Sequence, residues 1–149
     1  MENIFDQKAN ESILARLEKI TAETKALWGK MSAAQMMWHC QKPIDVLTGK
    51  LLLKGGLLGF LFGKMAKNNF LKMKGFSKSS PTHPRFRSND SPEFEKEKAT
   101  LIAMVSALGK LGDESIMIDK HPFFGPMTNQ EWGMLMYLHL DHHLKQFGA

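Results

Sequence analysis

The stretch that decides the fold is TNQEWGMLMYLHLDHHLKQF, residues 128–147. It opens on Thr128 with Glu131 three residues later. This is a capping-box pattern, in which each side chain bonds the backbone N–H of the other residue at a helix start. Apolar residues then recur at helical spacing to the end of the stretch. We therefore predict that the last helix begins at Thr128 and runs to about residue 147.

Two histidines of this stretch lie on its apolar side. His139 and His143 are four positions apart, so a helix stacks their side chains about 5–6 Å apart at Cβ. They share a stripe with Trp132 and Met136 and are expected to face the core. Two interpretations are open at this point. Either the imidazoles share a divalent metal ion, or each ring is hydrogen-bonded within the core.

Three further segments have the helical period, at about residues 10–28, 32–53 and 91–112. The second opens on Ser32 and Gln35, another capping box, and Pro43 inside it predicts a kink. The third opens on Ser91, a cap followed by proline, and Gly109 or Gly112 marks its end. Strand patterns are nearly absent. Four amphipathic helices without a sheet predict an all-α fold, an antiparallel four-helix bundle formed as one domain by residues 1–149.

The connection between the second and third segments, about 54–90, is long and basic. No Asp or Glu occurs within 46–89, whereas nine basic residues do: Lys50, Lys54, Lys64, Lys67, Lys72, Lys74, Lys78, Arg85 and Arg87. A short helix is expected at 57–70. Three interpretations of the charge are open: a solvated loop, a surface that gathers an anionic substrate or thiol cofactor, or a helix that touches an anionic membrane surface.

Composition excludes several classes of protein. Cys40 is the only cysteine, which rules out an internal disulfide and fits a reducing compartment. The most apolar stretch, LLLKGGLLGFLF at 51–62, contains a lysine and is shorter than the roughly 20 residues of a membrane span. The polar N-terminus is not expected to act as a signal peptide, and arginines are too few for a nucleic-acid module. We expect a soluble cytoplasmic protein and leave a homodimer open.

A metal held by two imidazoles needs further ligands. His39 is the best candidate, because it lies inside the second helical segment among apolar residues. His83 and His121 instead lie beside prolines in expected loops. Three imidazoles would leave one coordination position open for water, which is the pattern of a catalytic rather than a structural site.

Two motifs resemble the DinB/YfiT-like superfamily of metalloenzymes. The His-x-x-x-His-x-x-Gln pattern of His139, His143 and Gln146 resembles the end of that family's last helix. The segment from Trp28 to His39, WGKMSAAQMMWH, resembles its entry into the second helix. The stretch HPFFGPMT at 121–128 further resembles an uncharacterised branch of the superfamily.

The resemblance implies an up-down-down-up four-helix bundle with a divalent-metal site at His39, His139 and His143. Zinc and nickel both suit imidazole ligands. Characterised relatives transfer low-molecular-weight thiols or use them as cofactors, which implies a metal-activated thiolate. The implied partner is a small molecule.

Three neighbouring residues have open roles. His142 is three positions from His139 and could replace His143 as a ligand, although the motif favours His143. Gln146 either orients a ligand or is solvated. His121 either lines the pocket or packs in a loop.

The remaining candidates have simpler interpretations. Cys40 points about 100° away from His39 on the helix and is expected to pack rather than to react. Asp141 is expected to face solvent. No carboxylate lies on the histidine-bearing stripes to act as a general base, which favours thiol chemistry or simple binding. Two functions are therefore weighed: a metal-dependent thiol transferase or hydrolase, and a non-catalytic metal- or small-ligand-binding stress protein.

Overall fold

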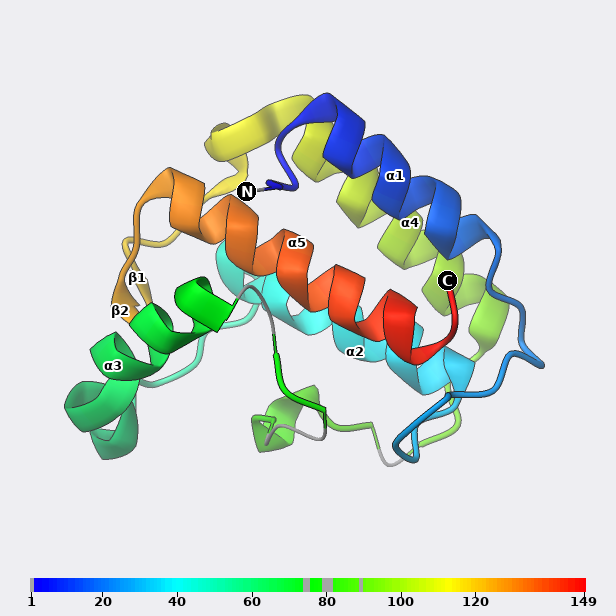
Figure 1. Cartoon of the computed structure of the whole chain (residues 1–149), viewed down its shortest axis with the longest axis horizontal. Helices are drawn as coiled ribbons and strands as arrows, with labels where there is room; N and C mark the ends of the chain where they lie inside the picture. Colours follow the sequence, from blue (N-terminus) through cyan, green and yellow to red (C-terminus); the bar gives the residue numbers. More distant parts are fainter. Residues whose placement is uncertain (1, 74–75, 79–81, 89) are drawn as a thin grey trace.

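The computed structural model describes residues 2–73, 76–78, 82–88 and 90–149 (Figure 1). This part of the chain is mostly helical, as predicted. It contains five α-helices: α1 (Gln7–Glu18), α2 (Ala33–Leu47), α3 (Leu57–Met73), α4 (Phe94–Leu111) and α5 (Asn129–Gln146). Two 3-10 helices and an antiparallel pair of two-residue strands join them: η1 (Pro84–Phe86), η2 (Gly112–Ser115), β1 (Lys120–His121) and β2 (Gly125–Pro126). No described helix is long and apolar enough to cross a membrane.

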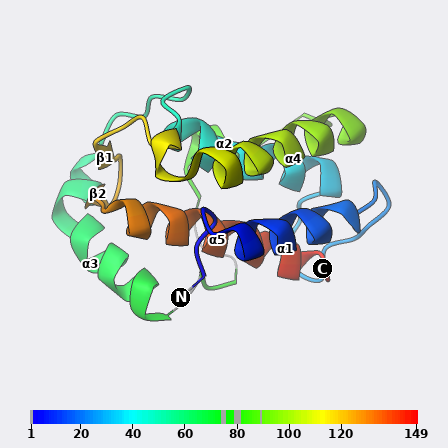
Figure 2. The same cartoon turned by 90° about the horizontal axis from the view of Figure 1, so that it is seen from above.

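Four of the helices surround one apolar core. α1 and α2 each contact both α4 and α5. Seen from above, α2 and α4 lie on one side and α1 and α5 on the other (Figure 2). The core takes buried side chains from all four helices, including Ile13, Met36, Leu101 and Trp132. The helix expected in the basic connection is present as α3, which lies outside this group beside β2 (Figure 1).

α5 begins at its predicted capping box. Thr128 Oγ1 accepts a hydrogen bond from Glu131 N at 3.1 Å, and Glu131 Oε2 accepts one from Thr128 N at 2.8 Å. Every residue from Trp132 to Leu138 is buried, because this helix packs against both α1 and α2. A helix that is apolar on all sides is a buried one. This burial brings the histidines that follow into the interior of the protein.

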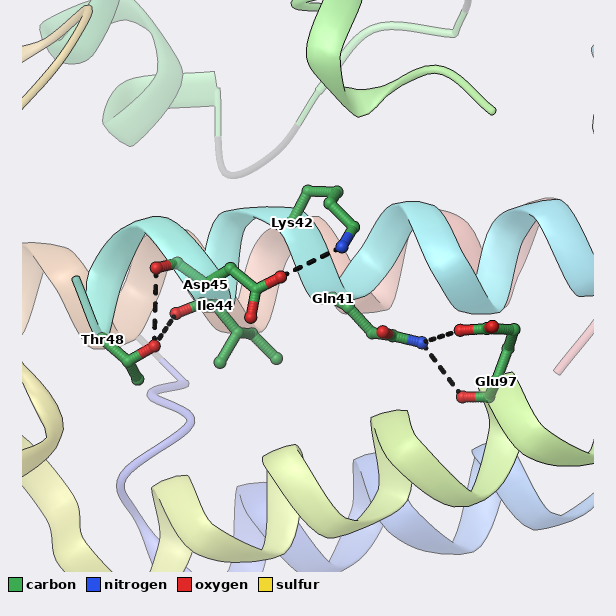
Figure 3. Close-up of polar contacts among 6 residues, drawn as sticks. All are labelled: Gln41, Lys42, Ile44, Asp45, Thr48 and Glu97. Atoms are coloured by element: carbon green, nitrogen blue, oxygen red, sulfur yellow. Dashed lines mark hydrogen bonds and ion pairs between the residues drawn. The ribbon is translucent and has the colours of Figure 1, made fainter. Parts of the chain in front are cut away.

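α2 also begins at its predicted capping box, in which Ser32 Oγ accepts from Gln35 N at 3.1 Å. The reciprocal bond from Ser32 N to Gln35 Oε1 is 3.0 Å. Farther along, the buried Gln41 donates from Nε2 to the backbone oxygen (3.2 Å) and to Oε2 (2.8 Å) of Glu97 on α4 (Figure 3). A buried amide is costly unless it is hydrogen-bonded, so this contact sets how α2 lies against α4.

The predicted continuation of α2 to residue 53 is wrong. The helix ends at Leu47, and Thr48 Oγ1 donates to the backbone oxygen of Ile44 at 2.9 Å (Figure 3). Gly49 follows with φ of 71°, a left-handed conformation that ends helices and favours glycine. The apolar sequence pattern runs past this glycine, but the helix does not.

The predicted bounds of the first helix, about 10–28, are also wrong, because α1 begins at Gln7 and ends at Glu18. Thr21 N donates to Thr24 Oγ1 at 2.9 Å, and Thr24 N donates back to Thr21 O at 3.1 Å. This threonine turn competes with the helix for the same backbone groups. Leu27, near the end of the predicted segment, is 70% exposed, and its N–H donates to the backbone oxygen of Gln146 at 2.7 Å.

α4 begins later than predicted and ends at the second of the two glycines predicted to end it. Glu93 rather than Ser91 occupies the N-cap position, and the helix starts at Phe94. At the other end Gly112 has φ of 58° and stops the helix after Leu111. Of the two predicted end positions, Gly112 is therefore confirmed and Gly109 lies inside the helix, whereas the serine-proline signal for the helix start is wrong.

α1 and α4 approach each other closely at one glycine. A Cβ on Gly109 would lie 2.6 Å from Cγ of Asn10. The Asn10 side chain is buried and donates from Nδ2 to the backbone oxygens of Val105 (2.8 Å) and Ile4 (3.1 Å). The space that Gly109 leaves therefore holds an amide that ties α1 to α4.

Candidate metal centre

Three histidines from two helices meet inside the protein. His39 lies on α2, and His139 and His143 lie on α5. Each offers a ring nitrogen, and these three nitrogens all lie within 4.8 Å of one another. The ring centroids are 4.6 Å apart for His39–His143, 4.7 Å for His139–His143 and 5.0 Å for His39–His139. The arrangement could hold one metal ion.

The outer nitrogen of His39 is occupied by a hydrogen bond. Its Nδ1 lies 2.8 Å from the backbone oxygen of Phe86, in the 3-10 helix η1. A carbonyl oxygen only accepts, so Nδ1 carries the proton and Nε2 of His39 keeps a lone pair. The backbone of η1 therefore sets the tautomer that turns a ligand atom toward the other two histidines.

Gln146 sets the tautomer of His143 in the same way. Gln146 Nε2 donates to the backbone oxygen of Trp28 at 2.8 Å, so its Oε1 faces His143 Nδ1 at 2.7 Å. That oxygen accepts the Nδ1 proton and leaves Nε2 of His143 with a lone pair. Such hydrogen bonds to the second ring nitrogen are typical of metal-ligating histidines.

The nitrogens that face one another are in direct contact. His39 Nε2 and His139 Nε2 are 3.1 Å apart. Because His39 Nε2 has the lone pair, His139 Nε2 supplies the proton of this hydrogen bond. An ion bound by both of these nitrogens would require His139 to carry its proton on Nδ1 instead.

Burial keeps all three rings neutral at pH 7. His39 and His143 are buried, and His139 is half-buried. Loss of solvation lowers the pKa of His39, and it lowers the pKa of His143 to about 3 from an ordinary value of 6.5. The pKa of His139 is lowered well below 6.5, first by burial and then by its two histidine neighbours. Neutral imidazole is the form that binds metals.

A pocket of about 660 Å³ opens at this cluster. Its walls come from α2, α5, η1 and two loops: Trp28, Gly29, Lys30, Met31, Gln35, His39, Phe76, Thr82, Phe86, Arg87, Ser88, His139, His142, His143 and Gln146. Among these lining residues two are cationic and none is a carboxylate. Lys78 adds a further cation nearby, with Nζ 4.5 Å from the Trp28 ring centroid. The pocket therefore carries a positive charge before any metal is bound.

His142 lines this pocket without joining the three-histidine cluster. It is half-buried, and its ring lies edge-on to Trp28 with centroids 5.9 Å apart. Burial lowers the pKa of His142, so this ring too is neutral at pH 7. Gln146 is buried and binds both His143 and the Trp28 loop, so the interpretation that it is merely solvated is wrong.

His121 lies elsewhere, and the hypothesis that it lines this pocket is wrong. It belongs to β1, and its ring packs on Trp132 with centroids 5.2 Å apart. Its Nδ1 accepts hydrogen bonds from the backbone nitrogens of Phe123 (3.0 Å) and Phe124 (3.1 Å). Burial lowers the pKa of His121 to about 4. Its role is to shape the hairpin loop.

Cys40 and Asp141 both have structural roles. Cys40 is buried with Sγ 3.7 Å from Met36 Sδ, and burial raises the pKa of its thiol, so the expectation that it packs rather than reacts is confirmed. The expectation that Asp141 faces solvent is wrong. It pairs with Arg16 at 2.8 Å and with Lys145 at 2.7 Å, and it ties α5 to α1.

Sequence reasoning missed the backbone partners of the centre. Phe86 and the Trp28 loop contribute carbonyl oxygens, which leave no signature in side-chain type. Pro84, at the first position of η1, is a recognisable signal for a short turn. It does not reveal that the turn covers His39.

One protein family matches nearly the whole of this chain. No curated protein and no solved structure matches it. The model of one protein family, described as "Protein of unknown function (DUF1569)", matches residues 5–149. That match covers the four core helices, both histidine-bearing helices among them, and the chain belongs to the DUF1569 family.

Proposed function

We propose that this protein is a DinB-like, divalent-metal-dependent enzyme whose ion is held by His39, His139 and His143. One observation carries the proposal: His39 and His143 each have Nδ1 bound to a fixed acceptor, which leaves a lone pair on Nε2 of each ring inside a cluster whose ligand nitrogens lie within 4.8 Å of one another. A cluster that only filled the core would not need three neutral rings at the wall of an open pocket. The proposal includes an up-down-down-up four-helix bundle formed by α1, α2, α4 and α5.

The donor set fits a borderline metal such as zinc or nickel, because all three donors are imidazole nitrogens and the described residues that line the pocket include no carboxylate. A divalent ion bound there would lower the pKa of a water or a thiol that reaches it. Among the described lining residues outside the cluster, His142 is a neutral imidazole that can accept a proton. We assign it the role of receiving the proton of that water or thiol at a ring nitrogen.

The charge of the pocket selects an anionic small molecule as substrate. Three neutral histidines do not offset the charge of a divalent ion, and Lys30 and Arg87 add to it. A carboxylate or phosphate on the substrate would balance this charge. A low-molecular-weight thiol that bears carboxylates has both the nucleophile and the charge. Transfer of such a thiol to an electrophile, or hydrolysis, is the reaction class that we propose.

A non-catalytic protein that holds a metal or a small anionic ligand is the second candidate. The absence of a carboxylate among the lining residues favours it, because hydrolases that use an activated water commonly have one as a general base. Turnover separates the two candidates, since both predict the same metal site.

Metal analysis of purified variants tests the centre. His39→Ala, His139→Ala and His143→Ala should each lose most of the bound metal, whereas His142→Ala should keep it. Chelation should lower the melting temperature of the parent, since an ion free at about 1,000 times its Kd stabilises the folded state by about 4 kcal/mol.

A screen of thiols with electrophilic acceptors then tests the reaction. We expect turnover by the metal-loaded parent and much slower turnover by His142→Ala. Metal binding without turnover would support the binding protein instead. A metal-free parent whose triad variants melt as it does would remove the centre altogether.

A further inference from the structure

One face of α3 holds this helix to the rest of the molecule. Gly59 and Gly63 lie four positions apart on that face, and a Cβ on Gly59 would lie 3.0 Å from the backbone oxygen of Phe123. The two glycines therefore let α3 approach the β1–β2 hairpin closely. Lys67 donates from Nζ to the backbone oxygen of Pro126 at 2.9 Å and pairs with Glu131 at 3.2 Å. These contacts fix the orientation of α3.

The opposite face of α3 is apolar and exposed. Leu57, Leu61 and Met65 follow one another at four-residue intervals and are 73%, 58% and 59% exposed, with Phe62 beside them at 48%. We call these four side chains the α3 apolar stripe. Single exposed hydrophobic residues are ordinary, but several on one helix mark an interaction surface.

Exposed cations accompany the stripe. Lys64 and Lys72 are exposed on α3, and Lys50 and Lys54 are exposed in the segment that leads to it. No acidic residue occurs within 46–89. An apolar stripe bordered by lysines is the pattern of a helix that lies in a membrane interface, where the lysine stems reach along the helix to lipid phosphates.

We propose that α3 docks this protein on an anionic phospholipid surface. The α3 apolar stripe would enter the boundary between headgroups and acyl chains, and Lys64 and Lys72 would contact phosphate groups. A second copy of the chain is a poorer occupant, because a two-fold contact through this face would bring its lysines together. An acidic protein would need a groove shaped to a helix on the outside of the molecule (Figure 2), whereas a lipid surface adapts to one.

Vesicle sedimentation of the full chain tests this proposal, and it needs neither metal nor substrate. We expect binding to vesicles of phosphatidylcholine mixed with phosphatidylglycerol, weak binding to phosphatidylcholine alone, and release by salt. Leu61→Glu with Met65→Glu should lower the partition coefficient by more than about tenfold. Lys64→Glu with Lys72→Glu should lower it by about tenfold on anionic vesicles.

Leu111→Glu is the matched control. Leu111 is 52% exposed at the end of α4, away from the stripe, so this variant should bind like the parent. Circular dichroism melting checks that each variant is folded. If a stripe variant does not fold, the lysine variant and the salt dependence of the parent still decide the outcome.

Three results would overturn the proposal. The first is no binding of the parent to anionic vesicles at low salt, and the second is equal loss in the Leu111→Glu control. The third is that the parent does not bind lipid but forms an oligomer, or a complex with an acidic protein, which the Leu61→Glu substitution dissociates. Each of these leaves the metal centre untouched, because Leu61 and Lys64 do not line its pocket.

Discussion

Replacing Gln146 with leucine should weaken both the fold and the metal site. Gln146 is buried, with its oxygen 2.7 Å from His143 Nδ1 and its nitrogen 2.8 Å from the backbone oxygen of Trp28. Leucine fills a similar volume but removes both hydrogen bonds. A buried group left without its partner costs about 1–3 kcal/mol, and the part-buried Trp28 carbonyl costs less, so the loss should total roughly 2–4 kcal/mol. The melting temperature should fall by roughly 5–15 °C.

Gln146→Leu should also bind metal more weakly than the parent. Without Gln146 the His143 ring can rotate and exchange tautomers, and loss of such a partner typically weakens metal binding by about 10–100-fold. Isothermal titration of the metal-free protein with zinc measures this change. Gln146→Glu keeps an oxygen that accepts from His143 Nδ1 and should lose less affinity than Gln146→Leu.

The control lies on the same helix. Gln130 is exposed in the first turn of α5, so Gln130→Leu should change neither melting nor zinc affinity. The reasoning is refuted if Gln146→Leu binds zinc within about twofold of the parent while its stability falls as expected. That result would mean that packing alone orients His143.

Three further predictions concern stability. The metal-free protein should lose stability as pH falls below 6.5. His143 binds a proton there in the unfolded state, but in the folded state burial holds its pKa at about 3 and it stays neutral. Urea unfolding should show that this residue alone lowers the free energy of unfolding by roughly 2 kcal/mol at pH 5. Gly109→Ala should cost about 1–3 kcal/mol, because its Cβ meets the anchored Asn10 side chain, and an unchanged melting temperature would contradict this close contact. Asp141→Asn should cost about 1 kcal/mol, and a double-mutant cycle with Arg16→Met should show coupling if their 2.8 Å pair is formed in solution.

Helix starts were predictable from the sequence where two residues three positions apart form a capping box. The Ser32–Gln35 and Thr128–Glu131 boxes each depend on residues three positions apart, so the sequence alone places them. The start of α4 was missed because Ser91 makes no such reciprocal pair and Glu93 takes its place.

Helix ends were less predictable from hydrophobic periodicity. The pattern continued through Leu27, but a turn between Thr21 and Thr24 had already drawn the backbone away from the helix. Similarly, apolar residues followed Gly49 although its left-handed conformation had ended α2. Periodicity reports which side chains are apolar, and it does not report where local hydrogen bonds replace the helical ones.

The sequence by itself determined that His139 and His143 share one face of a helix, because four residues are about one helical turn. It also placed His39 inside a second apolar helix. Only the tertiary structure decided that the three meet. The contacts that build the centre join residues 47, 100 and 118 positions apart, through Phe86, His39 and Gln146. Such contacts depend on how α2, α5 and their loops pack around a common core, and packing is a property of the assembled helices rather than of any one segment.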